Sequence, residues 1–342
     1  MLFPGPAHRE ALGALYAADD LDLEVEMVDW ADRPDVALAK AAEGTRSWIV
    51  ANETPVDDRQ RRQLARAHVL LALDAPVDLP GLAPRLRWVQ AVGAGIGPLA
   101  ATLRGTGIPV HTTAGASSVP IAEFVMARLL GVWKRVRTFD ELQRSRTWAP
   151  PTAAPPSVGV AGRTLGIVGT GSIGREIARR AAAFDLRVVG VRRRPELAPP
   201  PGFDRVVGAD RLAEVLPECD ALVLAAPGTA RTDRLIGATE LAALPAGAVL
   251  CNVARGTLVD EAALVASLES GHLAAAILDV TDPEPPSRQN PLWGLPGVYL
   301  SPHASALVPG HFERVTEIFL DNLRRDQAGE PLRNPADLDE GY

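Results

Sequence analysis

Short apolar runs alternate with helix-like stretches along the first 110 residues of the chain. The apolar runs lie at 24–28, 48–50, 69–73 and 88–92, and the stretches with helical spacing lie at 34–43, 57–67 and 98–103. Apolar runs of this length are typical of buried strands. Because strands that alternate with helices form parallel sheets, the pattern predicts an α/β fold.

The same alternation continues after residue 160. Predicted strands lie at 164–168, 187–191, 221–225, 248–253, 273–280 and 298–300, and predicted helices at 210–216, 238–244 and 260–270. The last of these helices begins with Asp260 and Glu261, which favour a helix N-terminus, and ends at Gly271. Ligands of such sheets bind beyond the carboxyl ends of the strands, so polar residues at those ends are the candidates for chemistry.

One long helical pattern joins the two regions. It begins after Glu123, carries apolar residues from Phe124 to Phe139, and extends to about Arg144. A helix this long and this apolar is expected to pack on more than one surface, which favours a subunit interface. A core helix in a monomer is the alternative.

The most specific motif lies directly after the predicted strand 164–168. Gly169, Gly171 and Gly174 have G-x-G-x-x-G spacing, and a helical pattern and a second strand follow. This order predicts a dinucleotide site, in which the glycines allow a tight turn, close approach of a pyrophosphate and close helix packing. The phosphates would lie at the helix N-terminus. The predicted cofactor-binding residues of this turn are Gly169, Thr170, Gly171, Ser172, Ile173 and Gly174.

The end of the second strand indicates which dinucleotide binds. An NAD site usually places Asp or Glu there, but this chain has Arg192, followed by Arg193 and Arg194. Guanidinium groups bind a 2′-phosphate through charge-assisted hydrogen bonds, whereas a carboxylate repels it. NADP(H) is therefore predicted in preference to NAD(H). Since Lys40 and Lys134 are the only lysines, a chance cluster of arginines is the competing explanation.

Composition narrows the class of protein. The 342 residues suffice for two domains, and the net charge of −7 disfavours nucleic acid or an anionic membrane as a partner. No apolar run is long enough for a transmembrane helix, and no signal peptide is recognisable. Cys219 and Cys251 are interpreted as buried free thiols in a reducing cytoplasm, and no metal site is predicted.

Three polar residues follow strand ends in the second region. They are Arg255, Glu284 and His303. Reduction of a 2-keto acid needs a cation that holds the carboxylate and a proton donor for the carbonyl oxygen; arginine and histidine suit these tasks. A carboxylate beside the histidine would orient its ring and favour its charged form. Each residue alone has an ordinary explanation as a loop charge, and sequence spacing leaves open whether the three converge.

A second glycine-rich turn follows the predicted strand 88–92. Gly93, Ala94, Gly95, Ile96 and Gly97 stand in sequence there, and such a turn leaves backbone N–H groups open to an anion. An ordinary turn between a strand and a helix is an equally good explanation from spacing alone.

Four ordered motifs together resemble the D-2-hydroxyacid dehydrogenases, the family of D-glycerate, glyoxylate/hydroxypyruvate and phosphoglycerate dehydrogenases. The resemblance runs through most of the chain and is strongest from about Gly93 to Asn334. The motifs are the turn 169–174, the segment 252–261 with Asn252 and Arg255, the segment 278–285 with Asp279 and Glu284, and the segment 291–303 that ends in Ser301-Pro302-His303.

The resemblance implies roles for individual residues. Arg255 would bind the substrate carboxylate and carbonyl, His303 would be the general acid for reduction, and Glu284 would hydrogen-bond His303. The amides of Ala94 and Gly95 would hold the substrate carboxylate. Asp279 would contact the nicotinamide carboxamide, while Thr113 and Ser301 would lie near the site. The remaining implied cofactor contacts are Arg192, Arg193, Ala226, Pro227, Val253, Ala254 and His303.

The family fold has two α/β domains, a Rossmann dinucleotide domain inserted into a flavodoxin-like substrate domain. It implies a substrate domain at 1–110 and 304–342 and a dinucleotide domain at 111–303. A homodimer through the dinucleotide domain is also implied. The chain departs from the family at Ile96-Gly97-Pro98 and at Arg192, where NADPH-preferring glyoxylate/hydroxypyruvate reductases have a similar basic replacement.

The predicted function is reduction of a small 2-keto acid to the D-2-hydroxy acid. A dinucleotide-sensing regulatory protein with vestigial catalysis is the alternative, because such a protein could retain all three polar residues. Oxidation of formate or phosphonate on the same fold has no residue in its favour. The identity of the keto acid stays open, since loops near Gly97, Trp148 and Trp293 would set it.

Overall fold

The computed structural model describes residues 13, 15, 18, 20–26, 28, 56–150 and 156–342. The predicted strand at 48–50 and the predicted helix at 34–43 lie outside these residues. The described part of the predicted strand at 24–28 lies in no strand. The chain divides into two compact units: Met1–Ser117, Pro283–Ser287 and Leu307–Tyr342 form the first, and Ser118–Asp282 and Arg288–Ala306 the second.

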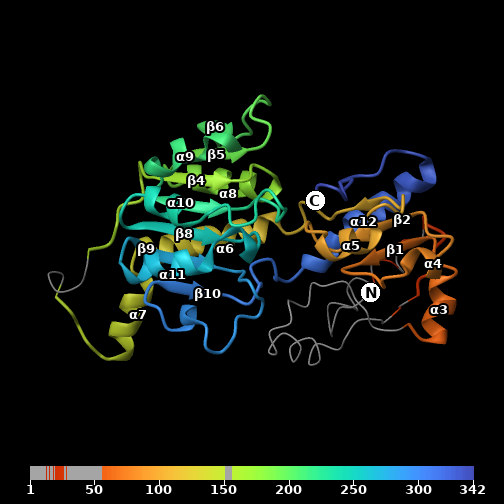
Figure 1. The fold of residues 1–342 in the computed structure, drawn as a ribbon, viewed down its shortest axis with the longest axis horizontal. Helices are drawn as coiled ribbons and strands as arrows, with labels where there is room; N and C mark the ends of the chain where they lie inside the picture. Colours follow the sequence, from red (N-terminus) through yellow and green to blue (C-terminus); the bar gives the residue numbers. More distant parts are fainter. Residues whose placement is uncertain are drawn as a thin grey trace. The chain divides into compact units, whose positions relative to one another are not determined.

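The second unit is built on a seven-stranded sheet in which every strand pair is parallel. The strands follow the order β10-β9-β8-β7-β4-β5-β6, with the crossover beside β4 that defines a doubly wound nucleotide-binding sheet (Figure 1). They are β4 (Thr164–Val168), β5 (Arg187–Arg192), β6 (Arg205–Gly208), β7 (Ala221–Leu224), β8 (Ala248–Asn252), β9 (Leu273–Leu278) and β10 (Val298–Leu300). The predicted α/β fold is confirmed.

Helices cover both faces of this sheet because its strands are apolar on both sides. Val223 and Cys251 pack with α6 (Ser118–Trp133) and α8 (Ser172–Ala182). Their neighbours Leu222 and Leu250 point to the other face. There they pack with α9 (Leu212–Val215), α10 (Ala238–Ala243) and α11 (Glu261–Glu269). Burial on both faces explains why the strands appear in the sequence as continuous apolar runs.

Short 3-10 turns connect several of these elements. They are η1 (Ala209–Arg211), η2 (Leu216–Glu218), η3 (Gly256–Leu258) and η4 (Pro291–Trp293). The predicted helix at 210–216 is thus broken into η1, α9 and η2, and Pro217 explains the change at its end because proline supplies no backbone N–H.

The long helix predicted to extend to about Arg144 is two helices. α6 ends at Trp133, and α7 (Val136–Arg144) begins after Arg135, whose φ of 58° is left-handed and cannot continue a helix. Helix α7 buries none of its side chains and extends away from the sheet of its unit (Figure 1). The single-helix prediction was therefore wrong at this junction.

The first unit contains a parallel sheet of β1 (Val69–Ala72), β2 (Trp88–Ala91) and β3 (Val110–His111) among the described residues. Val89 of β2 packs with α5 (Gly97–Leu103) on one face. Trp88 packs with α12 (His311–Ala328) on the other. α3 (Asp58–Leu64) and α4 (Leu79–Leu82) are further helices of this unit.

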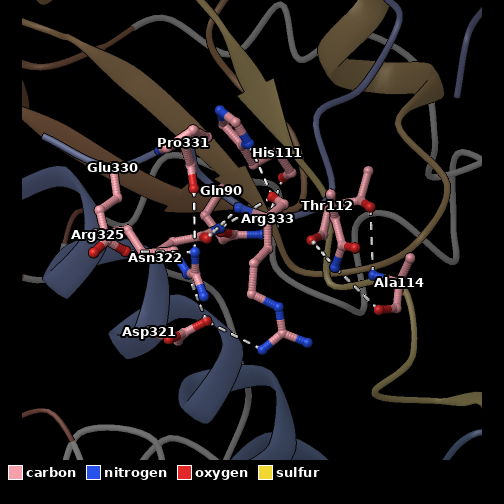
Figure 2. A network of polar contacts seen from close by, with 11 residues as sticks. Gln90, His111, Thr112, Ala114, Asp321, Asn322, Arg325, Glu330, Pro331 and Arg333 are labelled. Atoms are coloured by element: carbon pink, nitrogen blue, oxygen red, sulfur yellow. Dashed lines mark hydrogen bonds and ion pairs between the residues drawn. The ribbon is translucent and has the colours of Figure 1, made fainter.

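A buried polar network ties the C-terminal segment to this sheet (Figure 2). The Asn322 side chain donates to Gln90 Oε1 at 2.8 Å and accepts from Arg333 N at 2.7 Å. The carbonyl of Arg333 accepts from His111 Nδ1 at 2.9 Å. Asn322 and Gln90 are fully buried, so each hydrogen bond compensates the cost of removing a polar group from water. The network explains why residues 307–342 fold with the first unit.

Both cysteines are buried free thiols, as predicted. Burial raises the pKa of Cys219 to about 12, and burial also raises the pKa of Cys251. Cys219 occupies space that a side chain at Gly166 would need, because an added Cβ there would lie 2.5 Å from the sulfur. Among the helices of the described residues, none combines the length and apolar character of a membrane span.

Candidate functional site

The candidate site residues of the second unit lie at one edge of its sheet. Because all seven strands are parallel, the residues that follow their carboxyl ends share that edge. The segments concerned begin at Gly169 after β4, Arg192 at the end of β5, Ala225 after β7, Val253 after β8, Asp279 after β9 and Ser301 after β10. Arg255 and His303 therefore come to the same edge as the glycine turn.

The glycine turn between β4 and α8 is fixed by close backbone packing. Gly169 has φ of 103°, and a side chain there would begin 2.5 Å from the Ala225 carbonyl oxygen. A Cβ at Gly174 would overlap with the carbonyl of Gly169, so only glycine lets α8 lie this close to β4. These are the steric demands that the G-x-G-x-x-G spacing predicts.

The same turn fits the phosphates of a dinucleotide. Gly171 precedes α8, and an added Cβ there would meet nothing within 4 Å. The first helical bond in α8 runs from Arg175 N to Gly171 O, so the amides of residues 172–174 have no helical acceptor. Open space beside free amides at a helix N-terminus is the arrangement that binds phosphate oxygens.

Arg192 lies at the position predicted to distinguish the two dinucleotides. Its Nη2 donates to the carbonyl of Leu197 and, at 3.2 Å, to that of Ala198. Its guanidinium therefore turns along the loop that follows β5, while Arg193 and Arg194 are exposed. The structure thus gives Arg192 a second task, that of holding the loop beside the expected ribose site.

The turn that carries Arg255 is braced by a buried asparagine. Asn252, at the end of β8, is 1% exposed. Its side chain donates to the carbonyl of Arg255 at 2.8 Å and accepts from Ala254 N at 3.0 Å. The guanidinium of Arg255 in turn donates to the Ala254 carbonyl at 2.6 Å. Gly256 then packs against the backbone of Thr281, where a side chain would overlap.

The turn that carries His303 is braced in the same way by Asp279. The Asp279 carboxylate, which is 2% exposed, accepts from Ser301 Oγ at 2.6 Å and Ala304 N at 3.0 Å. The amide and hydroxyl of Ser305 also donate to it. His303 N donates to the Asp279 carbonyl at 2.9 Å, and His303 has φ of 50°. Several hydrogen bonds therefore hold this strained conformation in place.

The segment that approaches Trp293 is anchored near the start of α11. Asn290 Nδ2 donates to Glu261 Oε1 at 2.7 Å, and Asn290 Oδ1 accepts from Leu292 N at 2.9 Å. Burial raises the pKa of Glu261, and nearby Asp282 adds to this effect while Asn290 opposes it. This anchor holds residues 290–292 to the start of α11 within the second unit.

The turn predicted to bind an anion in the first unit also has free amides. Thr113 braces it, since its hydroxyl donates to the Val92 carbonyl at 2.5 Å and its amide donates to the Gly93 carbonyl at 3.3 Å. In the described residues, the amides of Ala94 and Gly95 make no backbone hydrogen bond. The turn thus provides two donors, as an anion would require.

The predicted site residues fall in both units. Arg255, His303 and Asp279 belong to the second unit, whereas Ala94 and Glu284 belong to the first. The hydrogen bond expected between Glu284 and His303 remains a prediction. No cluster of three or more His, Cys, Asp or Glu side chains within the described ranges could hold a metal ion.

Comparison with known proteins identifies the family. Residues 126–305 match the NAD binding domain of D-isomer specific 2-hydroxyacid dehydrogenases. The chain belongs to this family. The predicted resemblance is therefore confirmed, and so is the enzyme class, an oxidoreductase that acts on the CH–OH group of 2-hydroxy acids.

Relatives of this dehydrogenase match along most of the chain. The (S)-sulfolactate dehydrogenase of Chromohalobacter salexigens is 33% identical over 290 residues, covering 84% of this chain and 86% of the relative. The glyoxylate reductase of Korarchaeum cryptofilum is 33% identical over 312 residues, covering 87% and 91%. A D-isomer specific 2-hydroxyacid dehydrogenase from Xanthobacter autotrophicus, solved with NADPH and MES, is 30% identical, covers 93% and 98%, and has a TM-score of 0.75.

The structure of this 2-hydroxyacid dehydrogenase adds residues that the sequence motifs left without a role. Asn252 and Gly228 both bear on Arg255: a Cβ at Gly228 would lie 2.9 Å from Arg255 Cγ. Asp279 was predicted to contact the nicotinamide, and the structure shows its carboxylate engaged by residues 301–305. The sequence signal for this brace was Asn252, three residues before Arg255. Its hydrogen-bond partners depend on the conformation of the turn between them, which sequence spacing does not define.

Proposed function

We propose that this chain is an NADPH-preferring reductase that converts a small 2-keto acid, such as glyoxylate or hydroxypyruvate, to the D-2-hydroxy acid. One observation carries the proposal. Arg255 and His303 follow strands on either side of β9, at the sheet edge that also holds the glycine turn. A carboxylate-binding cation and a proton donor thus share an edge with the cofactor turn.

The proposed roles follow from the chemistry of each group. The guanidinium of Arg255 offers paired donors that match a carboxylate and polarise the adjacent carbonyl. The imidazolium of His303 gives its proton to the carbonyl oxygen as the alcohol forms, and Glu284 orients that ring. The amides of Ala94 and Gly95 hold the substrate carboxylate. Stabilising negative charge on the carbonyl oxygen lowers the barrier to reduction.

The cofactor is proposed to be NADP(H), which supplies the hydride when bound. The residues proposed to hold its phosphates and neighbouring groups are those of the turn 169–174 together with segments after β7 and β8, namely Ala226, Pro227, Val253 and Ala254. Arg192 and Arg193 are proposed to bind the 2′-phosphate, a view supported by the Xanthobacter relative solved with NADPH.

A panel of keto acids with NADPH and NADH tests the proposal. It includes glyoxylate, hydroxypyruvate and the keto acid that corresponds to sulfolactate, because a relative is a sulfolactate dehydrogenase. His303→Ala should lower kcat by roughly 10²–10⁴-fold, as loss of general acid catalysis does. His68→Ala, which changes an exposed histidine, is the control and should retain activity. Cofactor binding without turnover across the whole panel would favour a regulatory protein instead.

We also propose a homodimer formed through the second unit. Helix α7 and the residues after it expose large apolar side chains: Val136 is 48%, Phe139 47% and Trp148 97% exposed. Such side chains concentrated on one projecting segment favour burial against another protein surface. The molar mass in solution, measured by light scattering, distinguishes this dimer from a monomer.

A further inference from the structure

We propose that Asn252 is the positioning residue for Arg255, and that Gly228 leaves the space in which the Arg255 stem lies. The inference rests on the proposed function, because it concerns how the chain sets the position of its substrate-binding guanidinium. It adds two residues to the site, neither of which is expected to touch substrate or cofactor.

Asn252 controls the backbone on both sides of the peptide that precedes Arg255. Its Oδ1 accepts from Ala254 N at 3.0 Å, and its Nδ2 donates to Arg255 O at 2.8 Å. A carboxamide is suited to this task because it has a donor and an acceptor on the same group. Since Asn252 is almost completely buried at the end of a central strand, the sheet fixes the brace itself.

The brace extends to the guanidinium through Ala254. The carbonyl of Ala254 accepts from Arg255 Nη1 at 2.6 Å, so the residue that Asn252 holds is the one that orients the charged group. A shift of this carbonyl would therefore move the guanidinium. Misplacement by about 1 Å is enough to lower the rate of an oriented reaction substantially.

Gly228, in the segment after β7, lies against the Arg255 side chain. An added Cβ would lie 2.9 Å from Arg255 Cγ and 3.2 Å from its Cβ. The atoms concerned are at the base of the side chain, where rotation cannot relieve the clash without moving the guanidinium. Gly228 is exposed, and its φ is not in the left-handed region, so its backbone accepts alanine.

The first experiment replaces Asn252 and, as a control, a second buried asparagine, Asn322. Asn252→Ala should raise the Kd for NADPH, measured by fluorescence, only slightly, through Ala254 of the proposed cofactor segments. It should lower kcat/KM for the keto acid by roughly 10- to 100-fold, mainly through KM. The Kd for oxalate, a carboxylate analogue that is not reduced, should rise in parallel. Asn322→Ala is the control, because Asn322 is also fully buried and also braces backbone, but in the first unit. It should lower the melting temperature while KM stays unchanged.

Gly228→Ala provides an independent arm should Asn252→Ala fold poorly. It should raise KM for the keto acid and lower the melting temperature less than Asn252→Ala does, because it leaves the hydrogen bonds of Asn252 in place. Gly159→Ala is its control, since an added Cβ at Gly159 would meet nothing within 4 Å. Wild-type KM in Gly228→Ala, or wild-type KM in a folded Asn252→Ala protein, would overturn the proposal.

A double-mutant cycle with Arg255→Ala separates positioning from general weakening of the fold. If Asn252 acts through Arg255, then Asn252→Ala should cause little further loss of kcat/KM in the Arg255→Ala background. If Asn252→Ala lowered kcat/KM by the same factor in the Arg255→Ala background as in the wild type, the role of Asn252 would be structural only. Failure of the proposed function is distinguishable, because in that case the wild-type protein itself would reduce none of the keto acids.

Discussion

Arg192 ends strand β5, and its guanidinium donates to carbonyls of the loop that follows. One side chain can thus hold the loop and still present charge to a 2′-phosphate, because a guanidinium has five donors. The sequence alone predicts the charge at this position. It does not predict the loop contact, since Leu197 and Ala198 meet Arg192 only through the path of the chain after the strand.

Substitution of Arg192 separates these two tasks. Arg192→Asp should lower kcat/KM for NADPH by roughly 10- to 100-fold relative to NADH, because hydrogen bonds to charged groups contribute about 1.5–3 kcal/mol. Arg192→Gln retains a donor for the loop but removes the charge, and it should show most of the same change. A wild-type protein that prefers NADH would contradict the assignment of the 2′-phosphate site.

Asp279 shows where prediction of the site from sequence stops. The apolar pattern places it near the end of the predicted strand 273–280, and the structure ends β9 one residue before it, at Leu278. The pattern does not predict its partners, because Ser301 and Ser305 reach its carboxylate through a turn in which His303 is left-handed. A residue type and a strand end are local properties, whereas the donors around a buried carboxylate are set by tertiary structure.

At the scale of elements, strong patterns gave correct strands and weak or mixed patterns did not. The predicted strands β4 and β10 match in both bounds, and β5 extends one residue further than expected. Strand β6 was missed because Arg205–Gly208 is short and ends in glycine. The α6–α7 break was missed because Arg135 has no sequence signature of a left-handed residue.

The glycine turn and helix α8 allow stability and cofactor binding to be separated. Gly174→Ala places a Cβ against the Gly169 carbonyl, so it should destabilise the protein by about 1–3 kcal/mol. Gly171→Ala adds a Cβ to open space and should cost less than about 1 kcal/mol, yet it blocks the approach of a pyrophosphate. Thermal unfolding and NADPH fluorescence titration of both variants measure the two effects. If Gly174→Ala and Gly171→Ala had the same melting temperature and lost the same NADPH affinity, the two glycines would not have the separate roles proposed.

At the scale of the whole molecule, the chain leaves the first unit after Ser117, contributes Pro283–Ser287 to it, and joins it again from Leu307 onward. The sequence prediction placed these boundaries at 110 and 303. Helix α6 explains part of the shift, because it packs against α8 on one face of the sheet of the second unit. The return is held by Asn322, Arg333 and His111 in the first unit (Figure 2).

Acidification should weaken the first unit through its buried histidines. Burial lowers the pKa of His111 below its ordinary value of 6.5; burial and nearby Arg314 do the same for His311. A lowered pKa means that the unfolded chain binds the proton first. The stabilising contribution is therefore complete above about pH 6.5 and is lost as pH falls through the folded value.

The measurement is the change in melting temperature between pH 7.5 and pH 5.5. His111→Gln should reduce that change while retaining a donor for the Arg333 carbonyl. His68→Gln, at an exposed position, should leave it as in the wild type. If the melting temperature of His111→Gln fell as much on acidification as that of the wild type, groups other than His111 would be responsible.

The reactivity of the two buried cysteines reports whether the seven-stranded sheet of the second unit is intact. Alkylating reagents attack the thiolate form of cysteine. At neutral pH almost no thiolate forms at Cys219, because burial raises its pKa to about 12 and its sulfur packs against Gly166. Cys251, inside β8, is equally inaccessible. Iodoacetamide should therefore modify native protein very slowly, and the mass gained over time should count the molecules whose sheet has opened.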